Sequence, residues 1–309
     1  MRTGPDYIQF YPTLRCNRSC EFCFNRALTP GPDMSVHDCA AMFTRLKTAG
    51  VRTIDIIGGE PTIHPDIVQI VQNAASSGFH VNLSSNGSNM RCLEELVLLG
   101  SDVTIGLSIN DHESLAAVSR FIEHYKPVVK AVFNPSLQEG LVHDILALEP
   151  RMFYLIYRDT LDPKDLFQSV PFHEFLSSVQ GRFLRFASGT VFCSGFLPEV
   201  KTCPELSGVR CPAGTTKLGV MPDGSVYPCN LFFGREEFRI GNILADPFDV
   251  IWNHAALSFF RTFSGNRCPR KTCDLHADCH GGCPAHSLMH GGSLDAPEPR
   301  CCVSGRDKI

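Results

Sequence analysis

Residues Arg15 to Phe24 read RCNRSCEFCF and place Cys16, Cys20 and Cys23 in the spacing C-x3-C-x2-C. The segment follows directly on an apolar run, YIQFY, that predicts a strand. Three thiolates on one tight loop can hold three corners of a cubane iron–sulfur cluster, which normally takes four cysteines. The fourth iron would then be open to a ligand from outside the protein. Because spacing alone does not identify a metal, a zinc knuckle, a disulfide loop and chance cysteines remain alternatives at this point.

The composition narrows the class of protein. The chain has 309 residues, 43% of them hydrophobic and 19% charged, which suits one large globular domain or two ordinary ones. A net charge of -4 leaves no basic surplus to neutralise phosphates, so we expect no nucleic-acid partner. We also expect a cytoplasmic protein without membrane contact, because we find neither a signal peptide nor a run of ~18 apolar residues. In a reducing compartment, 15 cysteines indicate metal or cluster ligation rather than disulfides.

Strand-like and helix-like segments alternate from Tyr7 to about Ser178. Strands are predicted at 7–13, 53–58, 80–85, 103–109, 128–134 and 153–158. Helices are predicted at 35–50, 65–77, 89–99, 111–125, 141–148 and 172–179. Six strands that alternate with helices predict parallel βαβ units, in either an open doubly wound sheet or a barrel. In both folds the chemistry lies at the carboxyl ends of the strands, and the three-cysteine loop follows such an end.

A glycine-rich motif follows the second predicted strand. Residues 56–61 read IIGGEP and include Gly58, Gly59 and Glu60. Taken alone, such a motif is more often a turn with a solvated glutamate than a binding site. Its position one strand after C-x3-C-x2-C favours a site.

Polar residues stand at the carboxyl ends of the later strands, where they would face the same mouth. These candidates are Ser85, Asn86, Ser108, Asn134 and Arg158. Helix N-capping by Asn110 or Asp111 is an equally good explanation for the polar residues after the fourth strand.

The cysteine spacing, with the aromatic Phe22 before the third cysteine, and the GGE motif resemble the signatures of the radical S-adenosylmethionine (SAM) superfamily. The resemblance implies a partial (β/α)6 TIM-like barrel. It implies that the open iron is chelated by the amino and carboxylate groups of SAM, and that the Gly58–Glu60 backbone and Glu60 contact the SAM ammonium. Ser85, Asn86, Ser108 and Asn134 are the matching candidates for the SAM carboxylate and ribose.

The character of the sequence changes from about Phe186, where Gly, Pro and Cys become dense. We therefore expect a barrel over residues 1–185 and a small Cys-rich domain over 186–309. The turn signal Pro222-Asp223-Gly224 predicts a β-hairpin that leads to Cys229. The cysteine pattern of this region resembles the SPASM domain, which carries auxiliary clusters on many radical SAM enzymes. One departure is the four residues between Cys268 and Cys273, where the family usually has two.

The SPASM resemblance implies two further [4Fe–4S] clusters. The first would use Cys203, Cys211, Cys229 and Cys283. The second would use Cys268, Cys273, Cys279 and either Cys301 or Cys302. Zinc is the alternative, since His276, His280 and His286 lie among these cysteines. Cys39 and Cys92 are expected to be packing residues, whereas Cys193 is a candidate ligand, hydrogen-atom donor or inert thiol.

The resemblance also implies the chemistry. The reduced cluster on Cys16, Cys20 and Cys23 cleaves SAM to a 5′-deoxyadenosyl radical, which abstracts hydrogen from an unactivated C–H bond. An external one-electron reductant of the flavodoxin or ferredoxin type is implied. Auxiliary clusters suit an oxidation, such as dehydrogenation or cross-linking, whereas epimerisation needs a hydrogen donor. The enzyme would thus be an oxidoreductase or an isomerase.

Two classes of substrate remain open from the sequence. Because the first strand starts by Tyr7, no leader-binding domain is expected before the barrel, and this favours a small molecule such as a sugar or aminocyclitol antibiotic intermediate. Maturation of a ribosomally made peptide is the alternative. A non-catalytic zinc or redox iron–sulfur protein is the alternative from another class.

Overall fold

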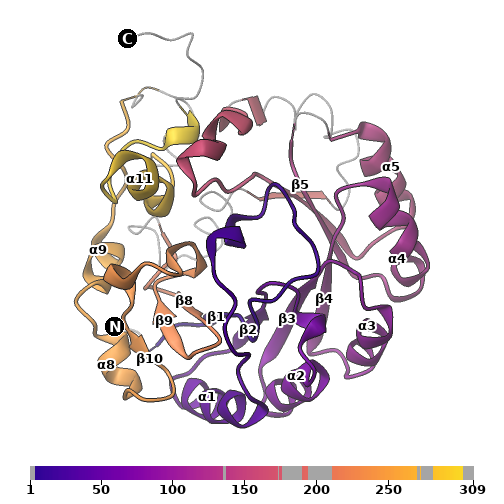
Figure 1. Cartoon of the computed structure of the whole chain (residues 1–309), viewed down its shortest axis with the longest axis horizontal. Coiled ribbons are helices and arrows are strands. Elements are labelled where there is room, and N and C mark those ends of the chain that lie inside the picture. Colours follow the sequence, from indigo (N-terminus) through magenta and orange to yellow (C-terminus); the bar gives the residue numbers. More distant parts are fainter. Residues whose placement is uncertain are drawn as a thin grey trace.

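The computed structural model describes residues 4–134, 137–172, 174–175, 190–193, 211–269, 272 and 281–301. Within these residues one sheet contains ten strands in the order β10-β9-β8-β1-β2-β3-β4-β5-β6-β7. The strands curve round a central opening, with helices on the outside (Figure 1). The predicted partial barrel with a C-terminal hairpin is confirmed.

The barrel strands run parallel, each one paired with the next. They are β1 (Tyr7–Phe10), β2 (Thr53–Ile56), β3 (His80–Ser85), β4 (Val103–Ser108), β5 (Val128–Val132), β6 (Met152–Ile156) and β7 (Thr190–Cys193). All six predicted strands are present, and β7 is an addition that the sequence pattern did not predict. The predicted boundary between residues 185 and 186 lies outside the described residues and stays a prediction.

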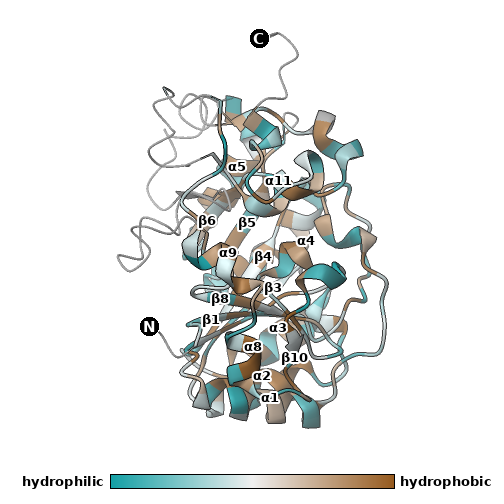
Figure 2. Cartoon of the chain, turned by 90° about the vertical axis from the view of Figure 1, so that its left-hand side faces the viewer, coloured by the Kyte–Doolittle hydropathy of each residue, from teal (hydrophilic) through white to brown (hydrophobic). Residues whose placement is uncertain are grey.

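Amphipathic helices cover the outer face of the barrel. They are α1 (Val36–Thr48), α2 (Ile67–Ser76), α3 (Met90–Val97), α4 (His112–Tyr125) and α5 (Glu139–Ala147). Side chains cap three of them: Ser35 accepts from Asp38 N, Asn89 from Cys92 N, and Asp111 from Ser114 N. Figure 2 shows hydrophobic and hydrophilic residues side by side on these helices, as expected for helices packed on a sheet. The predicted helix at 172–179 lies mostly outside the described residues.

Alternation along the strands sorts side chains between two environments. In β3, Val81, Leu83 and Ser85 are buried, whereas Asn82 and Ser84 between them are only half-buried. The buried set packs against helix residues in one continuous apolar core. The other set leaves polar groups on the inner face of the barrel.

The C-terminal part continues the same sheet. The predicted hairpin is confirmed as β8 (Lys217–Val220) antiparallel to β9 (Ser225–Tyr227), with Gly224 in the turn at φ 82°. β8 also pairs in parallel with β1, with Tyr7 opposite Lys217, so the hairpin extends the edge of the barrel. The remaining elements are η1 (Phe24–Ala27), η2 (Pro61–Ile63), η3 (Pro163–Gln168), η7 (Asn230–Phe232), η8 (Glu236–Phe238), β10 (Gly241–Asn242), α8 (Phe248–Trp252), α9 (Leu257–Thr262), α11 (Pro284–Gly291) and η9 (Pro299–Cys301). Among the described helices, none combines the length and apolar character needed to cross a membrane.

Candidate active site

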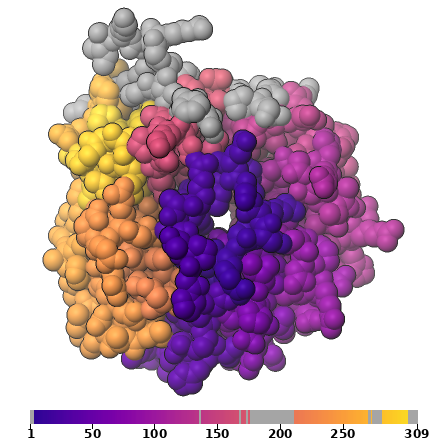
Figure 3. All heavy atoms as spheres, viewed as in Figure 1, coloured from indigo at the N-terminus to yellow at the C-terminus, as the bar shows by residue number. Residues whose placement is uncertain are grey.

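The three-cysteine loop lies at the carboxyl end of β1, in the connection to α1. It arches over the mouth of the barrel in Figure 1, and Figure 3 shows an opening ringed by atoms of this N-terminal part of the chain. Cys16 is exposed, Cys20 and Cys23 are half-buried, and all three are free thiols. Local backbone contacts shape the loop: Cys23 N donates to Cys20 O at 3.1 Å, and Arg18 N lies 3.4 Å from Cys16 Sγ.

The three sulfurs lie close enough to affect one another. Burial raises the pKa of Cys20, and the neighbouring Cys23 and Cys16 raise it further. The pKa of Cys23 is also raised, first by burial and then by Cys16. Nowhere in the described residues do three His, Cys, Asp or Glu side chains converge as the ligands of one metal ion would. A cubane holds its thiolates apart at separate corners, so three neighbouring cysteines around an opening fit that group by their chemistry.

The GGE motif is docked on the backbone of this loop. Gly59 N donates to Thr13 O at 3.1 Å, and Glu60 N donates to Arg15 O at 2.8 Å. A Cβ on Gly59 would lie 2.0 Å from Arg15 O, and Gly58 adopts φ 134° against Thr13. The glycines therefore allow close approach to the cysteine loop, whereas the resemblance had predicted approach to the cofactor.

Glu60 is a buried acceptor between two strand ends. Its side chain is 1% exposed. Oε1 accepts from Thr62 N at 3.1 Å, Thr62 Oγ1 at 2.6 Å and Ser85 Oγ at 2.8 Å. Oε2 accepts from Asn86 N at 2.6 Å. Three predicted cofactor residues, Glu60, Ser85 and Asn86, are thus brought together, and the carboxylate fixes the loops after β2 and β3.

Asn86 extends this network to the cysteine loop. Its Nδ2 donates to Asn17 Oδ1 at 2.9 Å, and Asn17 Nδ2 donates to Ser88 Oγ at 2.8 Å. The other predicted cofactor residues, Phe22, Ser108 and Asn134, are half-buried. Asp111 caps α4, whereas Asn110 Oδ1 accepts from Val132 N at 2.8 Å. Both residues therefore have structural partners.

Cationic side chains near the mouth were largely missed by the sequence analysis. Arg158, which follows β6 and is 8% exposed, donates from Nη2 to Glu21 O at 2.8 Å, and Arg26 donates to the same carbonyl at 3.1 Å. Burial lowers the pKa of Arg158, and Arg26 lowers it further. Lys130 Nζ donates to Ser84 Oγ at 2.6 Å. The only signal for Lys130 was one charged residue in the strand VVKAV.

The auxiliary cysteines are more deeply placed than those of the loop. Cys229 is buried directly before η7, and Cys211 and Cys283 are part-buried and pack against the core. Burial raises the pKa of Cys283 well above its usual range, and neighbouring Cys211 adds to this. These neighbouring cysteines, none of them in a disulfide, therefore suit a shared cluster. Cys268 and Cys301 are half-buried. Cys203, Cys273, Cys279 and Cys302 lie outside the described residues.

Two other predictions can be placed in part. Cys193 ends β7, opposite Ile156 of β6, at the end of the sheet where the cysteine loop begins. Its side chain is outside the described set. The zinc alternative involved three histidines, of which His276 and His280 are not described. His286 is fully buried and contacts Arg300 and Thr160 through its two ring nitrogens.

One buried hydroxyl joins the two cysteine regions. Tyr11 OH accepts from Asn25 Nδ2 and from Asn230 Nδ2, each at 3.1 Å. Asn25 lies two residues after Cys23, and Asn230 directly follows Cys229. The loop and the hairpin therefore share a common support.

Family models match both parts of the chain. The model of the radical SAM superfamily matches residues 10–134, and that of SPASM, an iron-sulfur cluster-binding domain, matches residues 211–284. The chain is a radical SAM protein with a SPASM domain. SAM and [4Fe–4S] clusters are therefore its cofactors, and the resemblance stated from the sequence is confirmed.

Similar proteins align along nearly the whole chain. Mycofactocin maturase MftC of Mycobacterium ulcerans is 26% identical over 334 residues, which cover 96% of this chain and 88% of MftC. PqqA peptide cyclase of Streptomyces rochei is 26% identical over 94% of this chain and 88% of its own. Subtilosin biosynthesis protein AlbA of Bacillus subtilis is 25% identical over 90% of this chain and 67% of its own.

Solved structures share the fold. Streptococcus suis SuiB bound to precursor peptide SuiA superposes with a TM-score of 0.75 at 18% identity, over 96% of this chain and 75% of SuiB. The enzyme anSMEcpe with bound AdoMet gives 0.70 at 18% identity, over 97% and 94% of the two chains. These values establish a common architecture.

The prediction of a small-molecule substrate is wrong. The relatives that align over nine-tenths of this chain are named as a maturase, a peptide cyclase and a bacteriocin biosynthesis protein. The prediction depended on the short stretch before β1. Since this chain covers 88% of both MftC and the PqqA cyclase, its length does not separate it from such proteins.

Proposed function

We propose that this protein is a radical SAM maturase of a ribosomally synthesised peptide. The observation that carries the proposal is the alignment of peptide-modifying relatives over both the barrel and the SPASM part. An opening beside the three-cysteine loop supports it, because a peptide segment needs an accessible mouth (Figure 3).

In this proposal, Cys16, Cys20 and Cys23 hold the cluster that binds SAM. The bound pair supplies reductive cleavage of SAM and abstraction of a hydrogen atom from the substrate. The residues of the chain hold this arrangement in place. Gly59 and Glu60 fix the loop through backbone hydrogen bonds to Thr13 and Arg15.

Polar residues at the strand ends are the proposed SAM contacts: Ser85, Asn86, Ser108 and Asn134. Ser85 and Asn86 also donate to Glu60, which holds them in place. Lys130 adds positive charge on the inner face of the barrel, and Arg158 adds positive charge at its mouth. An anionic group of the cofactor or peptide would be stabilised there.

The second part of the chain is proposed to hold two auxiliary clusters. Cys203, Cys211, Cys229 and Cys283 would bind one, and Cys268, Cys273, Cys279 with Cys301 or Cys302 the other. Complete cysteine ligation leaves no iron open, so these clusters suit electron transfer rather than substrate binding. They would accept the electron released when the peptide is oxidised. A flavodoxin- or ferredoxin-type protein would reduce the SAM-binding cluster.

The test is a peptide assay under anaerobic conditions. The reconstituted enzyme is incubated with SAM, a one-electron reductant and candidate precursor peptides from short reading frames near its gene. We expect 5′-deoxyadenosine together with a peptide that has lost two hydrogen atoms, as an oxidative cross-link requires. Uptake of one deuterium from heavy water without net oxidation would indicate epimerisation instead, with Cys193→Ala as the variant that abolishes it.

The control is the Cys16→Ala, Cys20→Ala, Cys23→Ala variant, which should modify no peptide. If wild-type enzyme forms 5′-deoxyadenosine, leaves the peptide unchanged and oxidises an aminocyclitol, the maturase assignment fails. The radical SAM assignment would survive that result.

A further inference from the structure

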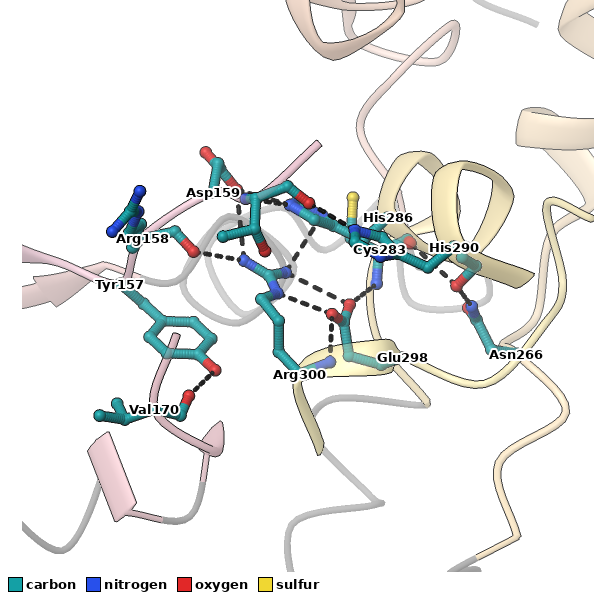
Figure 4. Close-up of polar contacts among 12 residues, drawn as sticks. Tyr157, Arg158, Asp159, Val170, Asn266, Cys283, His286, His290, Glu298 and Arg300 are labelled. Carbon is teal, nitrogen blue, oxygen red and sulfur yellow. Dashed lines mark hydrogen bonds and ion pairs between the residues drawn. The ribbon is translucent and has the colours of Figure 1, made fainter. Parts of the chain in front are cut away.

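A buried ion pair, Glu298 with Arg300, lies where the chain after α11 meets the end of β6 (Figure 4). Arg300 is 0% exposed and Glu298 is 2% exposed. Arg300 Nε donates to Glu298 Oε1 at 2.7 Å, and Nη2 donates to Oε2 at 3.2 Å. This fork-to-fork geometry fixes both side chains relative to each other.

Arg300 attaches the pair to the barrel. Its Nη1 donates to Arg158 O at 2.9 Å and to Asp159 Oδ1 at 3.4 Å, both directly after β6. The guanidinium lies 4.9 Å from the centre of the Tyr157 ring. Nη2 also lies 3.2 Å from Nδ1 of His286, on α11. One side chain thus contacts the barrel wall and the SPASM helix (Figure 4).

Glu298 attaches the pair to a candidate cluster ligand. Its Oε2 accepts from Cys283 N at 2.9 Å. The approach is close, because a Cβ on Gly282 would lie 2.4 Å from Glu298 Cβ, and Gly282 adopts φ 106°. Glu298 therefore fixes the backbone of Cys283, the residue that caps α11.

Charge gives the pair a second effect on the same cysteine. The negative carboxylate of Glu298 lies 2.9 Å from Cys283 N, and the positive guanidinium of Arg300 lies on the other side of that carboxylate, at 2.7 Å. A buried ion pair adds little stability over an apolar replacement, because desolvation offsets the attraction. The position of the two charges beside Cys283 is therefore more informative than the contribution of the pair to stability.

We propose that Glu298 and Arg300 are positioning residues of the auxiliary cluster that Cys283 ligates. Glu298 holds the ligand backbone, and Arg300 balances the charge of Glu298 while it ties the site to the end of β6. This inference depends on the assignment of Cys283 as a ligand under the proposed function. The described auxiliary cysteines fit such a site, since Cys211 and Cys283, neither of which is in a disulfide, lie near each other.

The experiment measures the cluster rather than peptide turnover. Reconstituted wild type, Glu298→Gln and Arg300→Met are titrated electrochemically and followed by electron paramagnetic resonance. Glu298→Gln should raise the midpoint potential of one auxiliary cluster, because a negative charge near the added electron is removed. Arg300→Met should lower it. Removing one general packing contact would not give shifts of opposite sign.

Three further variants complete the design. Glu298→Ala, which removes the acceptor of Cys283 N–H, should lower the iron content by about four atoms per chain, one cubane, and leave SAM cleavage without peptide intact. Matched controls are Arg91→Met and Glu95→Gln, from an exposed ion pair on α3, and they should shift no potential.

If Arg300→Met does not fold, the Glu298→Gln, Arg300→Met double variant decides, because it removes both charges of the buried pair together. We expect it to fold and to hold fewer auxiliary clusters than wild type. Unchanged potentials with full iron in the variants, shifts in the same direction, or loss of the SAM-binding cluster as well would each overturn the inference. Wild-type protein that never binds auxiliary clusters would refute the cluster assignment itself, independently of the peptide assay.

Discussion

The two cysteine regions are held in different ways. The Cys16–Cys23 loop is open to solvent and is fixed mainly by backbone hydrogen bonds to the Gly58–Glu60 segment. Cys283 is half-buried, and a fully enclosed ion pair fixes its backbone. A site that admits cofactor and substrate must leave space around its ligands, whereas a site that only passes electrons can be enclosed. The proposed roles, chemistry at the loop and electron transfer at the auxiliary clusters, match this contrast.

The largest expected effect comes from removing the open site. The Cys16→Ala, Cys20→Ala, Cys23→Ala variant should form no detectable 5′-deoxyadenosine and should lack about four iron atoms per chain. The auxiliary clusters should remain, because no cysteine of the loop contributes to them in the proposed ligand sets. Iron analysis with paramagnetic resonance measures both. Loss of all clusters would show that the two regions are not independent.

The second test concerns thiol reactivity in the apo protein. Burial, with Asp38 nearby, raises the pKa of Cys39 to about 12, so its thiolate fraction at pH 8 is roughly 1000-fold below that of a free cysteine. Exposed Cys16 should be alkylated first, and Cys39 only after unfolding. Once the chain unfolds, the burial that raises the pKa of Cys39 is lost, and Cys39 should then react as fast as a free cysteine. Mass spectrometry of iodoacetamide-treated protein measures the order, and early labelling of Cys39 would contradict its packing role.

The third test breaks the docking of the loop. In Gly59→Ala the new Cβ would lie 2.0 Å from Arg15 O, so the cysteine loop must move. A displacement of about 1 Å can cost roughly 100-fold in rate, and we expect a loss of that size in SAM cleavage. Gly140→Ala on α5 is the matched control, because nothing lies within 4 Å of its Cβ. Equal rates of SAM cleavage for both variants would show that Gly59 does not hold the cysteine loop in place.

The smallest effect concerns the link between the two regions. Tyr11→Phe leaves Asn25 and Asn230 without their shared acceptor, at an expected cost of about 1 to 2 kcal/mol in the free energy of unfolding. Tyr125→Phe, at a half-buried ring packed on Phe121, is the control and should change it by less than about 0.5 kcal/mol. Urea denaturation of the apo protein measures the stability of both variants. Equal midpoints would show that the Tyr11 hydroxyl does not stabilise the contact between the two cysteine regions.

The barrel was predictable from sequence because its signals are local. Strand alternation, the caps Ser35 and Asp111, and the Asp223-Gly224 turn each act within a few residues. All the predicted strands except β3 end earlier than predicted, since the residues after them turn to dock loops, as Gly58 does against Thr13. β7 was missed because four residues, TVFC, carry too little periodicity.

The site was only partly predictable. Spacing singled out Cys16, Cys20 and Cys23 as the proposed ligands, because all three lie on one loop. The roles of Glu60 and of the Glu298–Arg300 pair depend on partners brought from other segments, which no local pattern records. Charges in the stretch APEPRCC suggest surface, yet Arg300 is fully enclosed.

The parallel pairing of β1 with β8 has a consequence for assembly. β1 is made first, yet it lies inside the sheet, and its partner on one side is the strand around Lys217. During synthesis on the ribosome, that edge of β1 stays unpaired until residue 220 has emerged. Contacts so distant in sequence form slowly, and an unpaired strand edge invites aggregation. A chain truncated before β8 should therefore be insoluble, and metal loading should follow completion of the whole polypeptide.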